Sequence, residues 1–137
     1  MPTSYGVLST YPPTQCGLAT FAAALVANLP GPGDQVAVVR VLNKPAPVAA
    51  AEVLHDLVAG SADSAVTAAV VLNTFDVVIV QHEYGIYGGA DGQEIVPLLE
   101  ALYVRRSWSC TRCSRVRRRA SARSSTGWLP QPAPSSR

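Results

Sequence analysis

The hydrophobic and polar positions of the first hundred residues alternate in blocks that predict strands and helices. Three short apolar runs, at residues 5–10, 35–42 and 76–81, predict the strands of a sheet. The run at 35–42 is mostly apolar on both faces, as in strands that helices cover on both sides. The run at 76–81 holds four consecutive β-branched residues between polar ends and gives the clearest strand signal.

Helical spacing of apolar residues separates these runs. Between residues 18 and 29, apolar side chains recur at offsets of 3, 4, 7, 8 and 11, which predicts an amphipathic helix that the Pro and Gly residues at 30–33 end. Further helices are predicted at about 47–59 and at 64–72. A fourth helix is predicted from Asp91, an N-cap residue with Glu94 three positions later, to Leu102.

The predicted order is strand, helix, strand, helix, helix, strand, helix. Such alternation is typical of right-handed βαβ units, so the predicted fold class is α/β, with a Rossmann-like, doubly wound parallel sheet. About one hundred foldable residues suit one small domain or part of a larger one. We place this domain at residues 1–102.

Composition changes abruptly after this domain. Of the 137 residues, 1–100 hold all nine acidic residues and only two basic ones, Arg40 and Lys44, for a formal charge of −7. Residues 101–137 hold nine Arg and no acid, for a formal charge of +9. A segment rich in Arg, Ser and Pro cannot bury enough apolar surface to order itself. We therefore expect residues 103–137 to form a disordered basic tail.

Two loops follow strands at the edge where ligands of open parallel sheets bind. The first, residues 11–17, ends in Cys16 and Gly17 at the start of a helix, where backbone N–H groups and the helix dipole can receive an anion. No G-x-G-x-x-G dinucleotide fingerprint is present. On this loop alone, a turn that uses Gly17 only for its backbone freedom is an equal alternative.

The second loop, residues 81–89, places His82 and Glu83 directly after the clearest strand. These side chains are suited to act as acid, base or hydroxyl-binding groups, and Tyr84, Tyr87 and three Gly residues suggest a shaped pocket wall. The alternative is a structural His at a strand end. The position at the binding edge of the sheet favours the functional interpretation.

Together the two loops resemble a known family. The segment Tyr11-Pro-Pro-Thr-Gln-Cys-Gly-Leu-Ala-Thr-Phe21, with Val80-Gln-His-Glu-Tyr-Gly-Ile-Tyr-Gly-Gly89 and Asp91-Gly92 about sixty residues later, is similar to the N-terminal domain of bacterial glycosyltransferases of the GT-B fold, family 4 type. The resemblance covers residues 5–102. It implies two Rossmann-like domains that face a cleft. It also implies transfer of a hexose from a nucleotide diphosphate sugar, with retention at the anomeric carbon and without an essential metal.

The resemblance assigns roles to residues. Cys16 and Gly17 would lie in the loop that approaches the donor diphosphate, and His82, Glu83 and Tyr84 would line the acceptor side of the cleft. The family binds its donor through a Glu-x7-Glu motif of the second domain, which cannot be carried over here. We therefore assign no catalytic residue, metal or cofactor and expect the fragment to be inactive. The partners expected of the intact relative are a nucleotide sugar and a sugar or lipid acceptor, with room for a peripheral membrane contact.

Three interpretations compete for the basic tail. Cys110 and Cys113 have the spacing of zinc ligands, but no second pair follows and neither His of the chain is placed to complete a site. Nine Arg with Trp108 and Trp128 suit contact with nucleic acid. That contact defines the alternative function, a non-catalytic α/β nucleotide- or partner-binding domain with a nucleic-acid-contacting tail. For the favoured interpretation we expect no nucleic-acid partner.

The third interpretation, which we favour, is that the tail is translated out of frame. New codons can be built from the third base of one codon and the first two of the next, with G or C at most free positions. Residues 105–114 then read Pro-Ala-Ile-Val-Val-Leu-His-Thr-Val-Leu, the buried strand that the alternating order requires. We place the frameshift near residues 102–104. Without that strand, we expect the sheet edge beside residues 76–81, or beside the neighbouring strand, to lack a partner.

Targeting signals and cross-links do not stand out in the sequence. No charged n-region precedes an apolar run at the N-terminus, and no segment reaches the roughly 18 apolar residues of a membrane span. Cys16 stands alone in the folding part, which therefore offers no internal disulfide. The expected location is cytoplasmic.

Overall fold

The computed structural model describes residues 1–47 and 50–110, with side chains described for 1–47 and 50–104. Its strands are β1 (Ser4–Ser9), β2 (Gln35–Leu42), β3 (Val53–Val58), β4 (Val77–His82) and β5 (Arg105–Cys110). They form one parallel sheet in the order β3-β2-β1-β4-β5. The α/β fold with a Rossmann-like parallel sheet, predicted from the alternation of elements, is confirmed.

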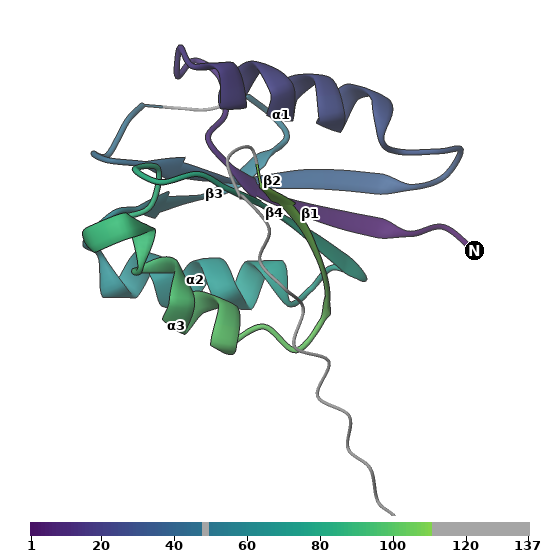
Figure 1. The fold of residues 1–137 in the computed structure, drawn as a ribbon. Helices are drawn as coiled ribbons and strands as arrows, with labels where there is room; N and C mark the ends of the chain where they lie inside the picture. The colour runs from purple at the N-terminus through teal and green to yellow at the C-terminus, as the bar shows by residue number, and fades with distance from the viewer. Residues whose placement is uncertain (48–49, 111–137) are drawn as a thin grey trace, which may run out of the picture.

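Helices cover both faces of the sheet. α1 (Gly17–Asn28) lies over one face, and α2 (Ala62–Leu72) and α3 (Ile95–Glu100) lie over the other (Figure 1). Right-handed crossovers require this arrangement, because the chain moves from β1 to β2 in one direction and from β3 back across the sheet to β4 and β5 in the other. The helices predicted at 18–29 and 64–72 are α1 and α2, with ends shifted by no more than two residues.

Each face of the sheet has its own hydrophobic core. Under α1, Val7 and Val38 of the sheet pack with Ala22 and Val26 of the helix and with Tyr11. The core under α2 and α3 is larger and includes Leu8, Val39, Val41, Ala69, Leu72, Val78, Val80, Ile95, Leu98 and Leu102. Neighbouring residues of one strand therefore enter opposite cores, as the two-residue period of a strand requires.

The helix predicted at 47–59 is wrong, because this segment contains β3. The four apolar residues of the predicted helical stripe also fit a six-residue strand with Val at both ends. Tertiary context decides between the two: β3 pairs with the outer edge of β2, and its Asp56 forms an ion pair with Arg40. The described part of the β2–β3 connection holds no helix.

The helix predicted at 91–102 starts later and ends earlier than predicted. Asp91 is not an N-cap residue: it has a φ of 54° inside a 3-10 turn (Ala90–Gly92), and α3 begins only at Ile95. The flanking Gly89 also has a positive φ, of 81°, so the backbone turns sharply here before it can become helical.

Glu94, predicted to complete a capping box, has a different partner. Its Oε2 accepts a hydrogen bond at 2.7 Å from the N–H of Gly60, in the turn between β3 and α2. The apolar stripe predicted for this helix is nevertheless buried, at Ile95, Leu98, Leu99 and Leu102. The prediction therefore had the buried face right and the helix start wrong.

The backbone of residues 105–110 extends the sheet past the predicted end of the domain. β5 pairs in parallel with β4 along its whole length, from Val77 opposite Arg105 to His82 opposite Cys110. The outer edge of β4, expected to lack a partner, is therefore covered. The rest of the predicted tail, 111–137, lies outside the described residues, as do the zinc and nucleic-acid interpretations that depend on it.

Candidate functional site

The loops after β1 and β4 leave the sheet at the same edge. β1 and β4 are neighbours, with Leu8 opposite Val80, so the two loops begin side by side. The chain goes from β1 to α1 on one face of the sheet and from β4 to α3 on the other (Figure 1). The direction of winding therefore reverses between β1 and β4, and open α/β sheets bind ligands at such switch points.

Cys16 caps the N-terminus of α1. Its Sγ accepts a hydrogen bond at 3.4 Å from the N–H of Ala19 and lies 3.4 Å from Oγ1 of Thr10. In the described part of the chain, the N–H groups of Gly17 and Leu18 donate to no acceptor, and the first turn of α1 holds no acidic residue. These donors and the positive end of the helix dipole suit an anion at this edge of the sheet.

The space around Gly17 is open. A Cβ added to this glycine would meet no atom within 4 Å, and its backbone is not in the left-handed region. Neither packing nor backbone freedom therefore requires glycine at this position. The backbone N–H at this position would be present with alanine as well, so the geometry points to the donor and not to the missing side chain.

Buried polar side chains gather just below these loops. In the described part of the chain, the buried polar or charged residues are Ser9, Thr10, Arg40 and Gln81. Arg40 lies opposite Ser9 in the β1–β2 register, and the Ser9 hydroxyl donates a hydrogen bond to Oε1 of Gln81 at 2.5 Å. Asp56 on β3 pairs with Arg40. A row of polar side chains therefore crosses four strands, from β3 to β4.

Arg40 is the buried charge in this row. Its Nε and Nη2 donate to the Asp56 carboxylate at 2.7 and 2.8 Å, and its side chain is 1% exposed, against 31% for Asp56. The hydrogen bond to Asp56 raises the pKa of Arg40 despite its burial, so the guanidinium stays charged. Among the described residues, Nη1 of Arg40 is the buried side-chain nitrogen or oxygen that has no hydrogen-bond partner.

His82 and Tyr84 lie together at the end of β4. The His82 ring stacks on Tyr87 with ring centroids 5.7 Å apart, and it meets the Tyr84 ring edge-on at 5.8 Å. Tyr87 is buried, which raises its pKa, and its hydroxyl donates to the backbone oxygen of Gln81 at 2.7 Å. Tyr87 therefore fixes the His82 ring, while Tyr84 is 59% exposed.

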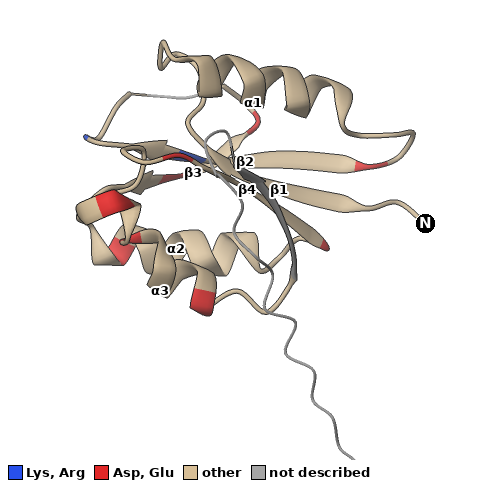
Figure 2. Ribbon diagram, viewed as in Figure 1, with Lys and Arg blue, Asp and Glu red and all other residues tan. Residues whose placement is uncertain are grey.

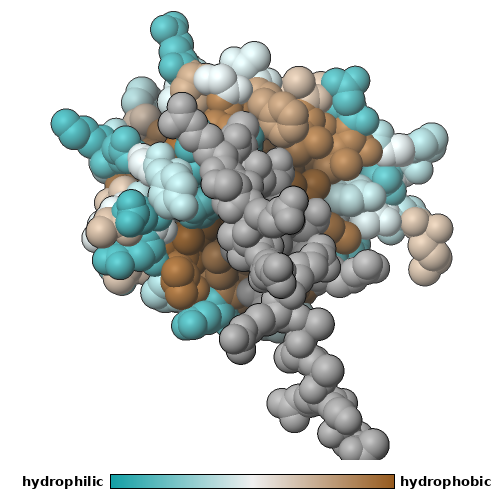
Figure 3. All heavy atoms as spheres, viewed as in Figure 1, coloured by the Kyte–Doolittle hydropathy of each residue, from teal (hydrophilic) through white to brown (hydrophobic). Residues whose placement is uncertain are grey.

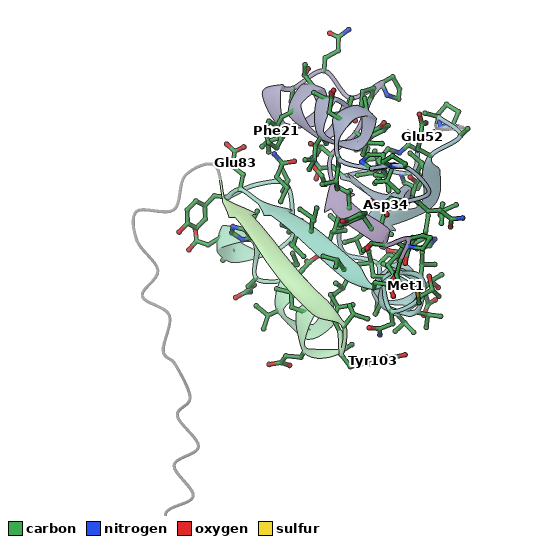
Figure 4. The ribbon with its side chains drawn as sticks, turned by 90° about the vertical axis from the view of Figure 1, so that its right-hand side faces the viewer. Met1, Phe21, Asp34, Glu52, Glu83 and Tyr103 are labelled. Atoms are coloured by element: carbon green, nitrogen blue, oxygen red, sulfur yellow. The ribbon has the colours of Figure 1, made fainter. Side chains whose placement is uncertain are left out.

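Glu83 lies apart from this aromatic cluster. Figure 4 shows Glu83 at the tip of β4, at the same edge as Phe21 of α1. Within the described residues, its carboxylate makes no hydrogen bond or ion pair. His82 and Glu83 are adjacent in sequence but form no acid–base pair. The predicted acceptor-side residues therefore divide into an aromatic pair, His82 with Tyr84, and a separate carboxylate.

The buried polar row was missed by sequence reasoning. The available signal was Arg40, the one charged residue inside the apolar run at 35–42. A charged residue is rarely fully buried unless it is paired, so its position in a buried strand indicates a partner or a function. The partner, Asp56, was hidden because its segment was predicted as a helix.

An apolar groove between α2 and α3 is a second feature that the sequence analysis did not predict. It has a cavity volume of about 380 Å³, and its lining includes Leu57, Ala65, Val66, Ile95 and Leu98. Figure 3 shows hydrophobic surface over these two helices. The one charged residue in its lining, Glu94, is bonded to Gly60. The groove offers no converging set of polar groups, so the candidate site lies at the carboxyl edge instead.

Among the described side chains, those of residues 1–47 and 50–104, no three His, Cys, Asp or Glu gather to hold a metal ion. No helix in that part of the chain has both the length and the apolar character needed to cross a membrane. No known protein family matches the chain, and neither a curated protein nor a solved structure does.

Proposed function

We propose that this chain is the N-terminal lobe of a two-lobed glycosyltransferase of the GT-B fold, which transfers a hexose from a nucleotide diphosphate sugar to an acceptor. The observation that carries the proposal is the meeting of the two motif loops, residues 11–17 and 81–89, at the switch point of the sheet. These loops are far apart in sequence and follow adjacent strands, so both can face one ligand.

The donor side of the proposed site is the N-terminus of α1. The free N–H groups of Gly17 and Leu18 suit the diphosphate of the donor, whose negative charge increases as the sugar leaves. The open space at Gly17 leaves room for a phosphate close to the backbone. Stabilising the leaving diphosphate in this way needs no bound metal from this lobe.

The acceptor side of the proposed site is the loop after β4. Tyr84 presents an exposed ring beside His82, and aromatic faces of this kind pack against the apolar face of a sugar ring. The unpaired carboxylate of Glu83 is suited to accept hydrogen bonds from sugar hydroxyls. We assign binding roles to these three residues and no catalytic step.

The proposal includes the reading frame of the gene. We propose that the segment from about residue 103 is out of frame, and that the lobe by itself is inactive because the reaction takes place between two lobes. The backbone of residues 105–110 pairs with β4 as a strand, and the more apolar strand of the alternative frame would suit the same order of elements. The coding DNA tests this step: an alternative frame that does not continue beyond codon 103 into a second domain contradicts it.

Nuclear magnetic resonance tests donor binding by the chain itself. Titration with uridine diphosphate glucose is expected to shift the amide signals of Gly17, Leu18 and His82 saturably, whereas uridine, which has no diphosphate, is expected to leave them in place. Shifts confined to the groove between α2 and α3, or none that saturate, would contradict the proposal.

A matched pair of variants at Gly17 sharpens this experiment. Gly17→Ala keeps the backbone N–H and is expected to bind as the wild type does, because its Cβ meets nothing within 4 Å. Gly17→Pro removes the N–H but is compatible with the first position of a helix, and the extended backbone of Cys16 (φ −150°, ψ 159°) accepts a following proline. Gly17→Pro is expected to lose binding while α1 persists.

A further inference from the structure

Nη1 of Arg40 is a buried side-chain donor without a partner in the described part of the chain. The guanidinium is planar, and its Nε–Nη2 edge faces the Asp56 carboxylate on β3. Nη1 therefore lies on the side of the group that faces away from this carboxylate. An unpaired donor on a buried charged group is costly, so an acceptor that completed Arg40 would bind favourably.

Arg40 lies beneath the start of α1. Val7 of β1 and Val38 of β2 pack against α1, and Ser9 and Arg40 follow them by two residues on the same face. Because the strands are parallel, this step of two residues leads toward the carboxyl edge of the sheet, where α1 begins at Gly17. Arg40 and the first N–H groups of α1 therefore share one face and one edge of the sheet.

Arg40 is a rare positive charge in an acidic part of the chain. Within residues 1–104, Arg40 and Lys44 are the only basic residues against nine acidic ones, and Figure 2 shows the acidic residues spread along the ribbon. Burial, followed by the charge of Glu52, raises the pKa of Tyr11, so the connection between β2 and β3 presents negative charge nearby. The first turn of α1 holds no acidic residue. The helix itself (GLATFAAALVAN) therefore adds no repulsion of an anion, and the negative charge nearby comes from Glu52.

We propose that Nη1 of Arg40 and the first N–H groups of α1 form an oxyanion site for a phosphoryl group. Each phosphorus of pyrophosphate carries three terminal oxygens and the two phosphorus atoms of a nucleotide diphosphate sugar carry two each, so either ligand has enough acceptors for Nη1, Gly17 and Leu18 at once, whereas a carboxylate has only two oxygens. The proposal deepens the proposed function, and it rests on that function only where it identifies the phosphoryl group as part of the donor diphosphate. Binding of the anion itself requires no sugar.

The Arg40 side chain is only 1% exposed, so access to Nη1 requires a neighbouring segment to move, and we infer that this is the turn that directly follows Ser9, the residue opposite Arg40. Two backbone hydrogen bonds hold this turn, from Thr14 N–H to the oxygen of Tyr11 at 3.1 Å and from Cys16 N–H to the oxygen of Thr14 at 3.2 Å. Thr14 and Gln15 are exposed at its tip. Binding is therefore expected to shift the amide signals of residues 11–16 as well as those at the start of α1.

The test uses the 137-residue chain, titrated with pyrophosphate and then with inorganic phosphate at constant ionic strength. The amide signals of Gly17 and Leu18 and the guanidinium signals of Arg40 are followed by nuclear magnetic resonance. Arg40→Lys keeps a positive charge that can pair with Asp56 but removes Nη1, so we expect it to weaken pyrophosphate binding at least tenfold. Lys44→Met, the matched control for general charge attraction, is expected to leave the affinity within twofold of the wild type.

Three results would overturn the phosphoryl site: no saturable binding by the wild type, equal affinity in Arg40→Lys, or an equal loss in Lys44→Met. If Arg40→Lys does not fold, the wild type decides, because its Arg40 guanidinium signals must shift at the same pyrophosphate concentrations as the amide of Gly17. Sugar transfer that survives Arg40→Lys would remove this site and leave the proposed function intact. Pyrophosphate binding without any nucleotide-sugar turnover would remove the proposed function and leave the phosphoryl site intact.

Discussion

The hydroxyl of Ser9 donates a hydrogen bond to Oε1 of Gln81 across 2.5 Å and so ties β1 to β4 directly below the two motif loops. Both side chains are buried, at 0% and 3% exposure. Ser9→Ala leaves the Gln81 oxygen buried without this donor, so we expect the free energy of unfolding to fall by about 1–3 kcal/mol. Urea denaturation monitored by circular dichroism measures this loss.

Thr67 supplies the control for this prediction. Its exposed hydroxyl donates to the backbone oxygen of Asp63 at 3.0 Å within α2, so its loss leaves no buried group unpaired. Thr67→Ala is expected to change the free energy of unfolding by about 0.5 kcal/mol or less. Equal effects of the two substitutions would show that the Ser9–Gln81 bond contributes nothing beyond an exposed hydrogen bond.

The hydrogen bonds between Ser4 and Asp76 predict how the free energy of unfolding depends on pH. Oδ2 of Asp76 accepts hydrogen bonds from the hydroxyl of Ser4 at 2.7 Å and from its N–H at 2.8 Å, and these bonds lower the pKa of Asp76. Since the folded-state pKa lies below the unfolded value, the stabilisation is complete above the ordinary Asp pKa of 3.8 and is lost as the pH falls through the lowered one. Asp76→Asn is therefore expected to reduce the loss of stability between about pH 5 and pH 2.

Denaturant unfolding at a series of pH values checks this prediction. Ser4→Ala removes the hydroxyl donor but keeps the backbone donor. It should therefore reproduce only part of the change in the slope of the free energy of unfolding against pH. A residual slope is expected in both variants, because backbone hydrogen bonds from Thr3 and Gly31 lower the pKa of Asp34 in the same direction. Identical slopes in the wild type and Asp76→Asn would contradict the account.

Gly6 is expected to tolerate no side chain. A Cβ at this position of β1 would lie 2.7 Å from Cδ2 of Phe75 and 3.2 Å from Cδ2 of Leu72. Gly6→Ala is therefore expected to overpack the core and lower the free energy of unfolding by about 1–3 kcal/mol. Gly17→Ala is the matched control, with a change of about 0.5 kcal/mol or less, since that Cβ meets open space. Equal losses would mean that packing does not distinguish the two glycines.

Most of the fold could be predicted because local pattern and tertiary structure agree in most elements. The β-branched run within β4 and the helical spacing of α1 each admit one secondary structure, although Phe21 of the predicted apolar stripe is 50% exposed. β3 could not be predicted in this way, because its six residues carry an apolar spacing compatible with both helix and strand. Its partner on β2, and not its own sequence, decides which one forms.

The candidate site could be predicted only where its residues sit in motif loops. Cys16 and Gly17 do lie at the start of a helix, and His82 does end a buried strand, as the sequence predicted. The buried row from Asp56 through Arg40 depends on the order and register of four strands, which no short motif encodes. The sharp backbone turn at Asp91 likewise depends on packing.

The central claim is that the carboxyl edge of this sheet is half of a sugar-transfer site. The most direct measurement is nucleoside diphosphate release from a panel of uridine, guanosine and adenosine diphosphate sugars by the protein encoded when the gene is read in the alternative frame after codon 103. We predict release from at least one donor, reduced about a hundredfold by Gly17→Pro and near the wild-type rate in Gly17→Ala. No release from any donor, or release that Gly17→Pro leaves unchanged, would contradict the account.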